Sequence, residues 1–210
     1  MARTTSPKCK LCRREGTKLF LKGERCFSSK CALVKKKYPP GLHGPKGYPK
    51  TSEYGLQLRE KQKIKRTYGI LERQLKNYFR KAVKTGGNAE ENLLKFLEQR
   101  LDNIVYRAGF APSRAAARQI VNHGHIRVNN RRVDIPSFQV KAGDEINLRP
   151  TSKIAKKIRE NINVNQGKIK PPDWLSFDEN QLTIKILRTL NSEELPKSLD
   201  YRLIIEFYSR

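Results

Sequence analysis

The amino-acid sequence predicts an α+β protein, with a mostly helical N-terminal domain and a small module of two helices packed on a short-stranded antiparallel sheet. Three patterns support this prediction. Four cysteines lie within the first 31 residues, apolar residues recur at helical spacing between residues 52 and 124, and apolar–polar alternation begins at residue 126. The length allows one or two small globular units.

Charge is unevenly distributed along the chain. The 210 residues include 45 Lys and Arg against 20 Asp and Glu, which gives a net charge of +25 and a pI near 10.2. Residues 1–88 hold 24 basic and 5 acidic residues, net +19, whereas residues 89–210 hold 21 and 15, net +6. Because such an excess repels itself unless a polyanion neutralises it, we expect a nucleic-acid partner and an N-terminal electrostatic anchor.

The sequence lacks the apolar segments that export or membrane insertion requires. The N-terminal MARTTSPKCKLC has no apolar stretch of signal-peptide length, and no segment approaches the ~20 apolar residues of a membrane span. We therefore expect a soluble, cytoplasmic protein in a reducing environment, without a membrane partner.

The cysteines form two close pairs, Cys9-x2-Cys12 and Cys26-x4-Cys31. Two thiolate pairs suit one tetrahedral Zn²⁺ ion, and neighbouring Lys and Arg residues favour charged sulfurs. We expect one structural zinc ion; disulfides, a redox CxxC motif and an iron–sulfur cluster are the alternatives. Four protein ligands would leave no position for a catalytic water. His43 is excluded, since a lone loop histidine more often forms hydrogen bonds or stacks.

Residues 1–50 are therefore expected to form a zinc knot followed by a basic strap. The strap sequence YPPGLHGPKGYPK is rich in proline and glycine, which exclude regular structure. Free in solution it would be disordered, whereas along a phosphate backbone it would become ordered on binding. We expect RNA contacts from the basic residues at its start, Lys35, Lys36 and Lys37.

Residues 51–96 are predicted to be a helical domain that residues 163–210 complete. Its first helix carries the basic run REKQKIKR and is broken at Gly69, and its second ends at Gly86. In the second helix an apolar face lies opposite a basic face, and only Glu72 adds a negative charge, whereas ordinary surface helices interleave Glu with Lys. We expect the RNA-facing residues of both helices to be Arg59, Lys61, Lys63, Arg66, Arg73, Lys76 and Arg80.

Residues 97–162 are predicted to form a helix-turn-helix-like RNA-binding module. An apolar stripe runs from residue 93 to Gly109, and Ser113 caps a second helix that ends at Gly124. HIRVN, VDIPSFQV and EINLR are expected to be strands, with Asn129-Asn130 in the first turn. A short basic helix begins after residue 152, and INVNQGKIKPPDW is expected to be a loop.

Residues 163–210 are predicted to return to the N-terminal helices and cover them. Trp174, Leu203, Ile204, Ile205 and Phe207 require burial, and about fifty residues are few for a separate core. The final segment fits both the helix and the strand period, so both remain open.

The run RLDNIVYRAGFAPSRAAARQIVNHGHIRVNNRRVDIPSFQVKAGDEI resembles the αL-type RNA-binding module of the small-ribosomal-subunit protein 4 family. CKLCRREG, LKGERC, HGPKGYPKTSEYGLQLREKQKIKRTYGILERQ and IIEFYSR also resemble its bacterial, zinc-binding type, so the resemblance covers essentially the whole chain. The module alone also resembles parts of pseudouridine synthases and tyrosyl-tRNA synthetases. The flanking segments distinguish these families from the ribosomal one, because they resemble only the ribosomal family. One departure is Asn130, where the family often has Gly; Asn tolerates positive φ.

The resemblance implies an RNA face on the module. Two features of the sequence agree with it, because Arg114 and Arg118 are one helical turn apart, and Ser113 lies at a helix N-terminus, which attracts phosphate. His123 and His125 lack an accompanying carboxylate or nucleophile pattern, which favours packing or RNA contact over acid–base chemistry. The implied RNA-binding residues are Arg100, Arg107, Ser113, Arg114, Arg118, Gln119, Asn122, His123, Arg127, Arg131 and Arg132.

The resemblance implies a structural, non-enzymatic component of the small ribosomal subunit. Such a protein binds small-subunit rRNA directly at a helix junction, nucleates subunit assembly, and lines the site where messenger RNA enters, beside proteins 3 and 5 of that subunit. One alternative is an RNA-modifying enzyme, but only about sixty residues follow the module, too few for its catalytic domain. The other is a zinc-dependent DNA-binding regulator, whose recognition helix would enter the major groove.

Overall fold

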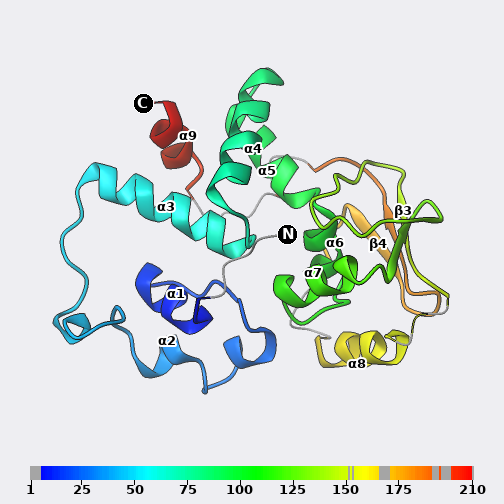
Figure 1. The fold of residues 1–210 in the computed structure, drawn as a ribbon, viewed down its shortest axis with the longest axis horizontal. Coiled ribbons are helices and arrows are strands. Elements are labelled where there is room, and N and C mark those ends of the chain that lie inside the picture. The colour runs from blue at the N-terminus through cyan, green and yellow to red at the C-terminus, as the bar shows by residue number, and fades with distance from the viewer. Residues whose placement is uncertain are drawn as a thin grey trace. The chain divides into compact units, whose positions relative to one another are not determined.

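The computed structural model describes residues 6–150, 152, 154–165, 171–190, 194 and 200–209. The chain divides into two compact units (Figure 1): unit 1 comprises Met1–Leu93 and Pro196–Arg210, and unit 2 comprises Leu94–Leu195. The boundary falls within helix α5 (Ala89–Glu98). No helix in the described ranges has the length and apolar character needed to cross a bilayer.

Unit 1 is built from helices in its described residues. They are α1 (Lys8–Glu15), η1 (Gly23–Cys26), α2 (Ala32–Lys35), η2 (Gly44–Lys46), α3 (Glu53–Thr67), α4 (Glu72–Lys84), the start of α5, and α9 (Arg202–Ser209), where η1 and η2 are single 3₁₀ turns. The Ser52 hydroxyl caps α3 by accepting the Gly55 N–H at 3.2 Å. Gly69 follows α3 with φ 64°, so the predicted break is present. The strap contains only the short turn η2.

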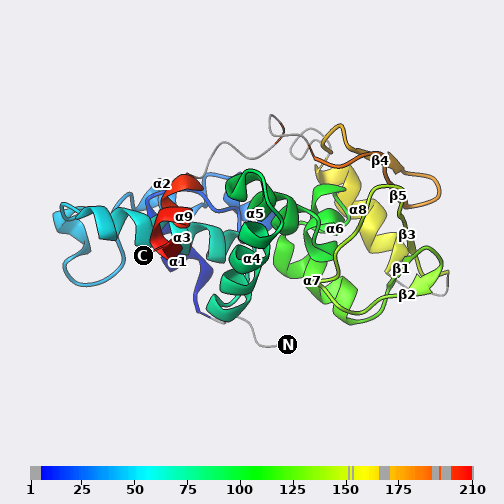
Figure 2. The same ribbon diagram turned by 90° about the horizontal axis from the view of Figure 1, so that it is seen from above.

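The core of unit 1 forms where α9 packs on α3 (Figure 2). Ile64 of α3, Leu75 of α4 and Ile204 of α9 are all 0% exposed. The last segment, for which the sequence left helix and strand open, is helical. Because its apolar residues lie on one helical face against α3, the end of the chain returns to the N-terminal helices as expected.

Unit 2 combines helices with one antiparallel sheet in the order β2-β1-β3-β5-β4. Its further elements are α6 (Leu101–Arg107), α7 (Arg114–Asn122), β1 (Ile126–Val128), β2 (Arg131–Arg132), β3 (Glu145–Leu148), α8 (Ala155–Asn165), β4 (Leu175–Asp178) and β5 (Thr183–Ile186). Asn129 and Asn130 have φ of 49° and 62°, as a two-residue type I′ turn requires. The predicted turn between the first two strands is therefore confirmed.

The region after residue 162 differs from the prediction. Strand β5 pairs with β3, with Ile184 opposite Ile146, and β4 pairs with β5. Trp174 is 2% exposed within unit 2, so it does not cover the N-terminal helices. The physical reason is the open edge of β3, whose backbone groups need partners that β5 supplies. The predicted boundary at 162 was therefore wrong, and only the end of the chain belongs to unit 1.

Three local predictions in unit 2 also differ. The apolar stripe from residue 93 is two helices, because the Gln99 carbonyl and the Leu101 N–H bond to Val140 and Phe138 instead of continuing one helix. Residues 133–140 form only an isolated bridge at Gln139, not a strand. Residues 162–165 belong to α8 instead of a loop, since Ile162 continues the buried face of that helix.

Candidate RNA interface

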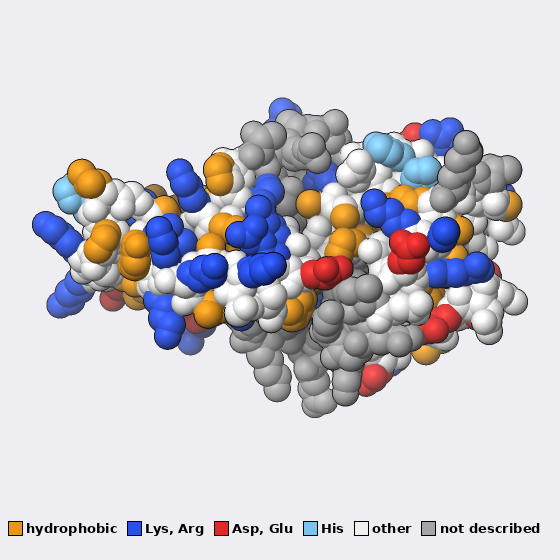
Figure 3. Space-filling view, turned by 90° about the horizontal axis from the view of Figure 1, so that it is seen from below, with side chains coloured by type: hydrophobic (Ala, Val, Ile, Leu, Met, Phe, Trp, Pro, Cys, Tyr) orange, Lys and Arg blue, Asp and Glu red, His pale blue; other side chains and the backbone are white. Residues whose placement is uncertain are grey.

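Helix α4 presents the most open basic face of unit 1. Arg73, Lys76 and Arg80 are exposed, whereas Leu75 and Ala82 on the other face are 0% exposed. Lys and Arg side chains also gather over unit 1 on the face seen from below in Figure 3. A hollow near the end of the helix is lined by Asn77, Arg80, Lys81, Lys84 and Thr85. The predicted separation of basic and apolar faces is present, and this face suits phosphate groups.

The strap is fastened to α1. The Arg13 guanidinium donates to the carbonyls of Tyr38 and Pro39, both at 3.0 Å, and lies 4.8 Å from the Tyr38 ring centre. The Tyr48 hydroxyl donates to the Arg13 carbonyl at 2.7 Å. Lys35, Lys36 and Lys37, just before these contacts, are exposed. Arg13 thus positions the strap, a role that the sequence did not indicate because its backbone partners leave no sequence pattern.

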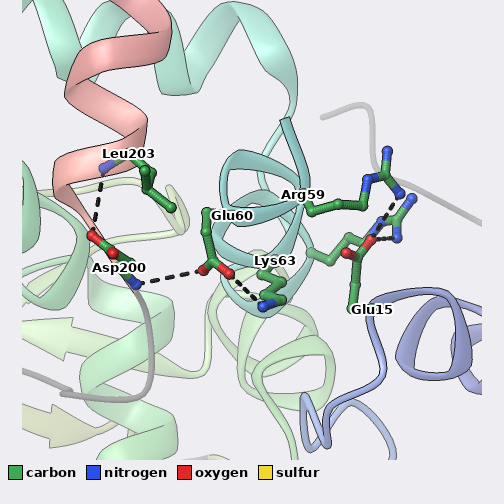
Figure 4. A network of polar contacts seen from close by, with 7 residues as sticks. Glu15, Arg59, Glu60, Lys63, Asp200 and Leu203 are labelled. Atoms are coloured by element: carbon green, nitrogen blue, oxygen red, sulfur yellow. Dashed lines mark hydrogen bonds and ion pairs between the residues drawn. The ribbon is translucent and has the colours of Figure 1, made fainter. Parts of the chain in front are cut away.

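Figure 4 shows that α3 is more internally paired than its basic sequence suggests. Arg59 and Arg66 both contact the Glu15 carboxylate, whose side chain is 0% exposed. Lys63 contacts Glu60, and Glu60 also accepts the Asp200 N–H at 3.4 Å. Side-chain exposures of 32% for Arg59 and 19% for Arg66 leave a limited surface for phosphate. The network joins α1, α3 and the segment before α9.

Lys61 does not face outward. The residue is 6% exposed, its Nζ lies 2.8 Å from Glu72 Oε1, and it lies 4.2 Å from the Phe207 ring centre. The Tyr208 hydroxyl donates to Glu72 Oε1 at 2.7 Å. Burial acts to raise the pKa of Glu72, but hydrogen bonds from Lys61, Tyr208 and Lys65 outweigh it and hold the pKa at about 2. In this arrangement Lys61 joins α3, α4 and α9 and offers no surface to RNA.

Arg100 is likewise internal, which contradicts its expected place on the RNA face. It is 0% exposed, and its Nε and Nη2 donate to the two Asp102 oxygens at 3.0 and 2.6 Å. Arg118, 8% exposed, lies 3.9 Å from the same carboxylate. A buried carboxylate is stable only beside compensating cations, which explains why both arginine side chains lie in the interior of unit 2. The helical spacing of Arg114 and Arg118 did not reveal this.

Two further predicted residues of the module are partly used for internal contacts. Arg107 makes two hydrogen bonds to Glu98, at 2.9 and 3.1 Å. Arg114 donates to Asn103 Oδ1 at 2.8 Å, with its guanidinium 4.6 Å from the Tyr106 ring centre. Both remain half-buried, so these contacts hold the guanidinium groups in defined positions at the surface.

Ser113 caps α7, as predicted. Its hydroxyl accepts the Ala116 N–H at 3.3 Å, and the residue is 8% exposed. The hydroxyl therefore serves the helix, and a phosphate at this position would contact the remaining backbone N–H groups.

The exposed part of the module lies on α7 and the adjacent hairpin β1–β2. Arg132 packs over the end of α7, because a Cβ atom added to Gly124 would meet its Nε at 2.5 Å. Arg127 is half-buried, with an Nε atom that has no partner among the described residues. The remaining predicted residues on this surface are all exposed, namely Gln119, Asn122, His123, Arg131 and Arg132.

A histidine pair lies at the base of this surface. The ring centres of His123 and His125 are 6.0 Å apart, and Ser152 Oγ lies 2.9 Å from His125 Nδ1. Burial, His123 and Arg149 lower the pKa of His125, which favours the neutral form of this ring. The sequence did not single out Arg149, yet the pairing of Ile126 with Leu148 could have placed it beside His125.

The four cysteines lie around one pocket. Cys9, Cys12, Cys26 and Cys31 all line it, and the Lys22 N–H donates to Cys26 Sγ at 3.3 Å. Burial raises the pKa of the Cys12 thiol, and charges on the other three would raise it further. The donor set suits zinc, yet within the described residues no three His, Cys, Asp or Glu side chains are placed to hold a metal ion. The expected zinc knot is thus not shown.

Comparisons with known proteins cover the whole length of the chain. A family model described as "Ribosomal protein S4/S9 N-terminal domain" matches residues 3–98, and one described as "S4 domain" matches residues 99–146. The small ribosomal subunit proteins uS4 of Natranaerobius thermophilus, Thermus thermophilus and Desulfitobacterium hafniense are 52%, 51% and 48% identical over 210 residues, 100% of both chains in each case. The chain therefore belongs to the uS4 family of small ribosomal subunit proteins.

Proposed function

We propose that this chain binds small-subunit rRNA directly at a junction of RNA helices and thereby nucleates assembly of the subunit. As a uS4 family member it is a structural component of the small ribosomal subunit and not an enzyme. The observation that carries the junction proposal is the presence of exposed basic side chains on each of the two compact units, on α4 and on the hairpin β1–β2 beside α7.

Two basic surfaces on separate units suit RNA recognised by shape. The deep groove of A-form RNA excludes side chains, so Lys and Arg contact phosphates, whose positions differ between a junction and a straight duplex. Gln119 and Asn122 of α7 and His123 directly after it are also exposed, and their side chains can hydrogen-bond ribose hydroxyls or bases. A straight duplex offers one regular phosphate track, whereas a junction offers several tracks to a chain with two units.

Binding of the full chain to a junction-containing rRNA fragment tests this proposal. The matched control is a continuous duplex with the same number of phosphates, measured at several salt concentrations. We expect tighter binding to the junction, and a fall in affinity of about 10³ to 10⁵ between 50 and 200 mM salt for six to ten phosphate contacts. Equal affinity for both RNAs would contradict junction recognition.

We further propose that part of the basic surface lines the site where messenger RNA enters the subunit, beside proteins 3 and 5. The resemblance of the sequence to the bacterial family supports this placement, and the exposed cations of β2, Arg131 and Arg132, provide the required charge. A photo-crosslinker at Arg131 in assembled subunits should label messenger RNA or one of these proteins. Labelling of rRNA alone would argue against the placement of this hairpin.

We also propose that the four cysteines hold one structural Zn²⁺ ion. What supports this is their common pocket and the preference of thiolates for zinc. When bound, the ion would fix the segment between α1 and α2 and would have no catalytic role. The test measures metal content and thermal unfolding of the whole wild-type chain and of Cys9→Ser, with Ser28→Ala as the control. Iron instead of zinc in the wild-type chain would indicate an iron–sulfur cluster. Unchanged metal content and stability in Cys9→Ser would disprove the assignment.

A further inference from the structure

Two phenylalanine rings lie exposed beside the cysteine pocket. Phe20, between α1 and η1, and Phe27, directly after η1, have ring centres 5.0 Å apart at an interplanar angle of 33°. Their exposures are 37% and 41%. Exposing a pair of large apolar rings to water costs free energy that burial elsewhere would recover. A pair kept at the surface thus indicates a contact that the isolated chain does not make.

The backbone at Phe20 supports this indication independently. Its φ is 49°, in the left-handed region that a residue with a Cβ atom rarely adopts. Leu19 on one side is 5% exposed, and Leu21 on the other lines the cysteine pocket. The positive φ lets the chain keep both leucines inward and the Phe20 ring outward next to Phe27. Strain of this kind persists where the surrounding structure enforces it, often at binding sites.

The charges around the two rings identify the kind of partner. Between residues 18 and 30 the exposed side chains include four cations and one carboxylate, Glu24; the cations are Lys18, Lys22, Arg25 and Lys30. An apolar surface whose sequence neighbours are exposed cations is poorly suited to another basic ribosomal protein. It suits RNA, in which a flat base carries an apolar face and the adjoining backbone carries phosphates.

We propose that Phe20 and Phe27 form a stacking platform for an unpaired base of the bound RNA, and that the flanking cations contact the phosphates on either side of it. The ligand is thus a single-stranded nucleotide, such as one in a bulge or at a junction. This inference rests on the proposed rRNA binding and adds aromatic stacking on the face of a base to the phosphate contacts and hydrogen bonds proposed for α4, α7 and the hairpin.

Binding measurements with conservative variants test the platform. Phe20→Leu and Phe27→Leu keep an apolar side chain but remove the flat aromatic ring. Phe27→Trp replaces one aromatic ring by another and so keeps a stacking surface. The control is Phe138→Leu, because Phe138 is also 37% exposed but lies in unit 2. We expect each platform variant to weaken binding of the junction fragment by about 5- to 150-fold, the range that one stacked base contributes. Phe27→Trp and Phe138→Leu should bind like the wild type.

Salt dependence separates stacking from phosphate contacts and from unfolding. Stacking releases no counterions, so the slope of log K against log salt should stay that of the wild type in Phe20→Leu, whereas Lys22→Ala should lower it by about 0.9. Thermal unfolding of both variants establishes that unit 1 remains folded. A slope that changed in Phe20→Leu would overturn the stacking role.

Abasic RNA locates the base. Unpaired nucleotides of the fragment are replaced one at a time by abasic residues and measured with both wild type and Phe27→Leu. At one position the loss of affinity from the abasic residue and that from Phe27→Leu should not add, because both changes remove the same interaction. Additive losses at every position would overturn the proposal. It would also be overturned if the variants bound the RNA normally but failed to enter subunits, because that result would indicate a protein partner. Absence of junction binding by the wild type would instead refute the proposed function.

Discussion

Arg100 and Asp102 form a two-point ion pair inside unit 2, with Nε–Oδ1 and Nη2–Oδ2 distances of 3.0 and 2.6 Å. The Arg100 side chain is 0% exposed and that of Asp102 is 4% exposed. The pair lies at the start of α6, where the Arg100 backbone also bridges to Gln139. The backbone bridge holds the chain between α5 and α6 against the segment before β3, and the ion pair fills the interior beside it, which is a structural role and not an RNA contact.

Replacement of Arg100 should thus destabilise unit 2. In Arg100→Ala the Asp102 carboxylate would lose its two-point partner, with Arg118 at 3.9 Å left among the described cations, and breaking a buried pair costs about 3–5 kcal/mol. We expect a loss of about 3 kcal/mol in the free energy of unfolding, measured by urea denaturation. Arg131→Ala, at an exposed position, should change it by less than about 0.5 kcal/mol. A stable Arg100→Ala variant with weakened RNA binding would instead restore Arg100 to the RNA face.

The basic face of α4 should contribute to RNA affinity mainly through charge. In the triple variant Arg73→Ala, Lys76→Ala, Arg80→Ala, the slope of log K against log salt should become shallower by up to about 2.7, or about 0.9 for each phosphate that is no longer neutralised. Filter binding of the junction fragment at several salt concentrations measures it. The control removes the same charge from α8, whose Lys156, Lys157 and Arg159 are exposed. An equal change in both triple variants would mean that only total charge matters.

The sequence allowed prediction of features that depend on nearby residues. Ser113 caps a helix where expected, and Gly69 breaks the chain where expected. These features follow from backbone geometry within a few positions. Lys61 was misplaced because its partners are distant in sequence, with Glu72 on the next helix and Phe207 near the end of the chain. Charge pattern alone cannot separate a cation that pairs inside from one that meets phosphate.

The sheet shows the same limit. Strand β1 and the turn after it were predictable from the alternation and the two asparagines, whereas β2 lies at Arg131–Arg132, before the strand that was predicted. Strand β5 joins β3 across 34 intervening residues, 149–182. Nothing in the local pattern of Thr183–Ile186 identifies β3 as its partner, since an apolar strand suits any open edge. The pairing of β5 with β3 also places Trp174 in unit 2. Its predicted place on the N-terminal helices was wrong because that pairing cannot be read from the local sequence.

Glu72 should make stability depend on pH. Its folded-state pKa of about 2 lies below the ordinary value of 4.5, so its contribution is present above pH 4.5 and is lost as the pH falls towards 2. Because its side chain is 44% exposed, solvent screening reduces this contribution to about 1 kcal/mol. Urea unfolding of Glu72→Gln should show this loss at pH 7 and almost none near pH 2. The exposed Glu24→Gln should lose little at either pH, and a constant deficit for Glu72→Gln would refute the ionic origin.

The turn between β1 and β2 allows a matched test of two neighbouring asparagines. Both have positive φ, but only the Asn129 side chain forms cross-strand contacts, donating to Asp144 Oδ1 at 2.8 Å and accepting the Glu145 N–H at 2.9 Å. Asn130→Gly should therefore be neutral or slightly stabilising, because glycine adopts φ 62° without strain. Asn129→Gly should cost about 1 kcal/mol, because both of these hydrogen bonds are removed.

A third variant at this turn links stability to binding. Asn130→Val places a β-branched residue in the left-handed region, at a cost of about 1–2 kcal/mol. Since Val128 pairs with Arg131 across the turn, distortion there would displace Arg131 and Arg132 from the surface next to α7. We expect Asn130→Val to weaken both thermal stability and junction binding, while Asn129→Gly weakens mainly stability. If Asn130→Val lost stability but bound the junction fragment as the wild type does, the hairpin arginines would not be part of the RNA interface.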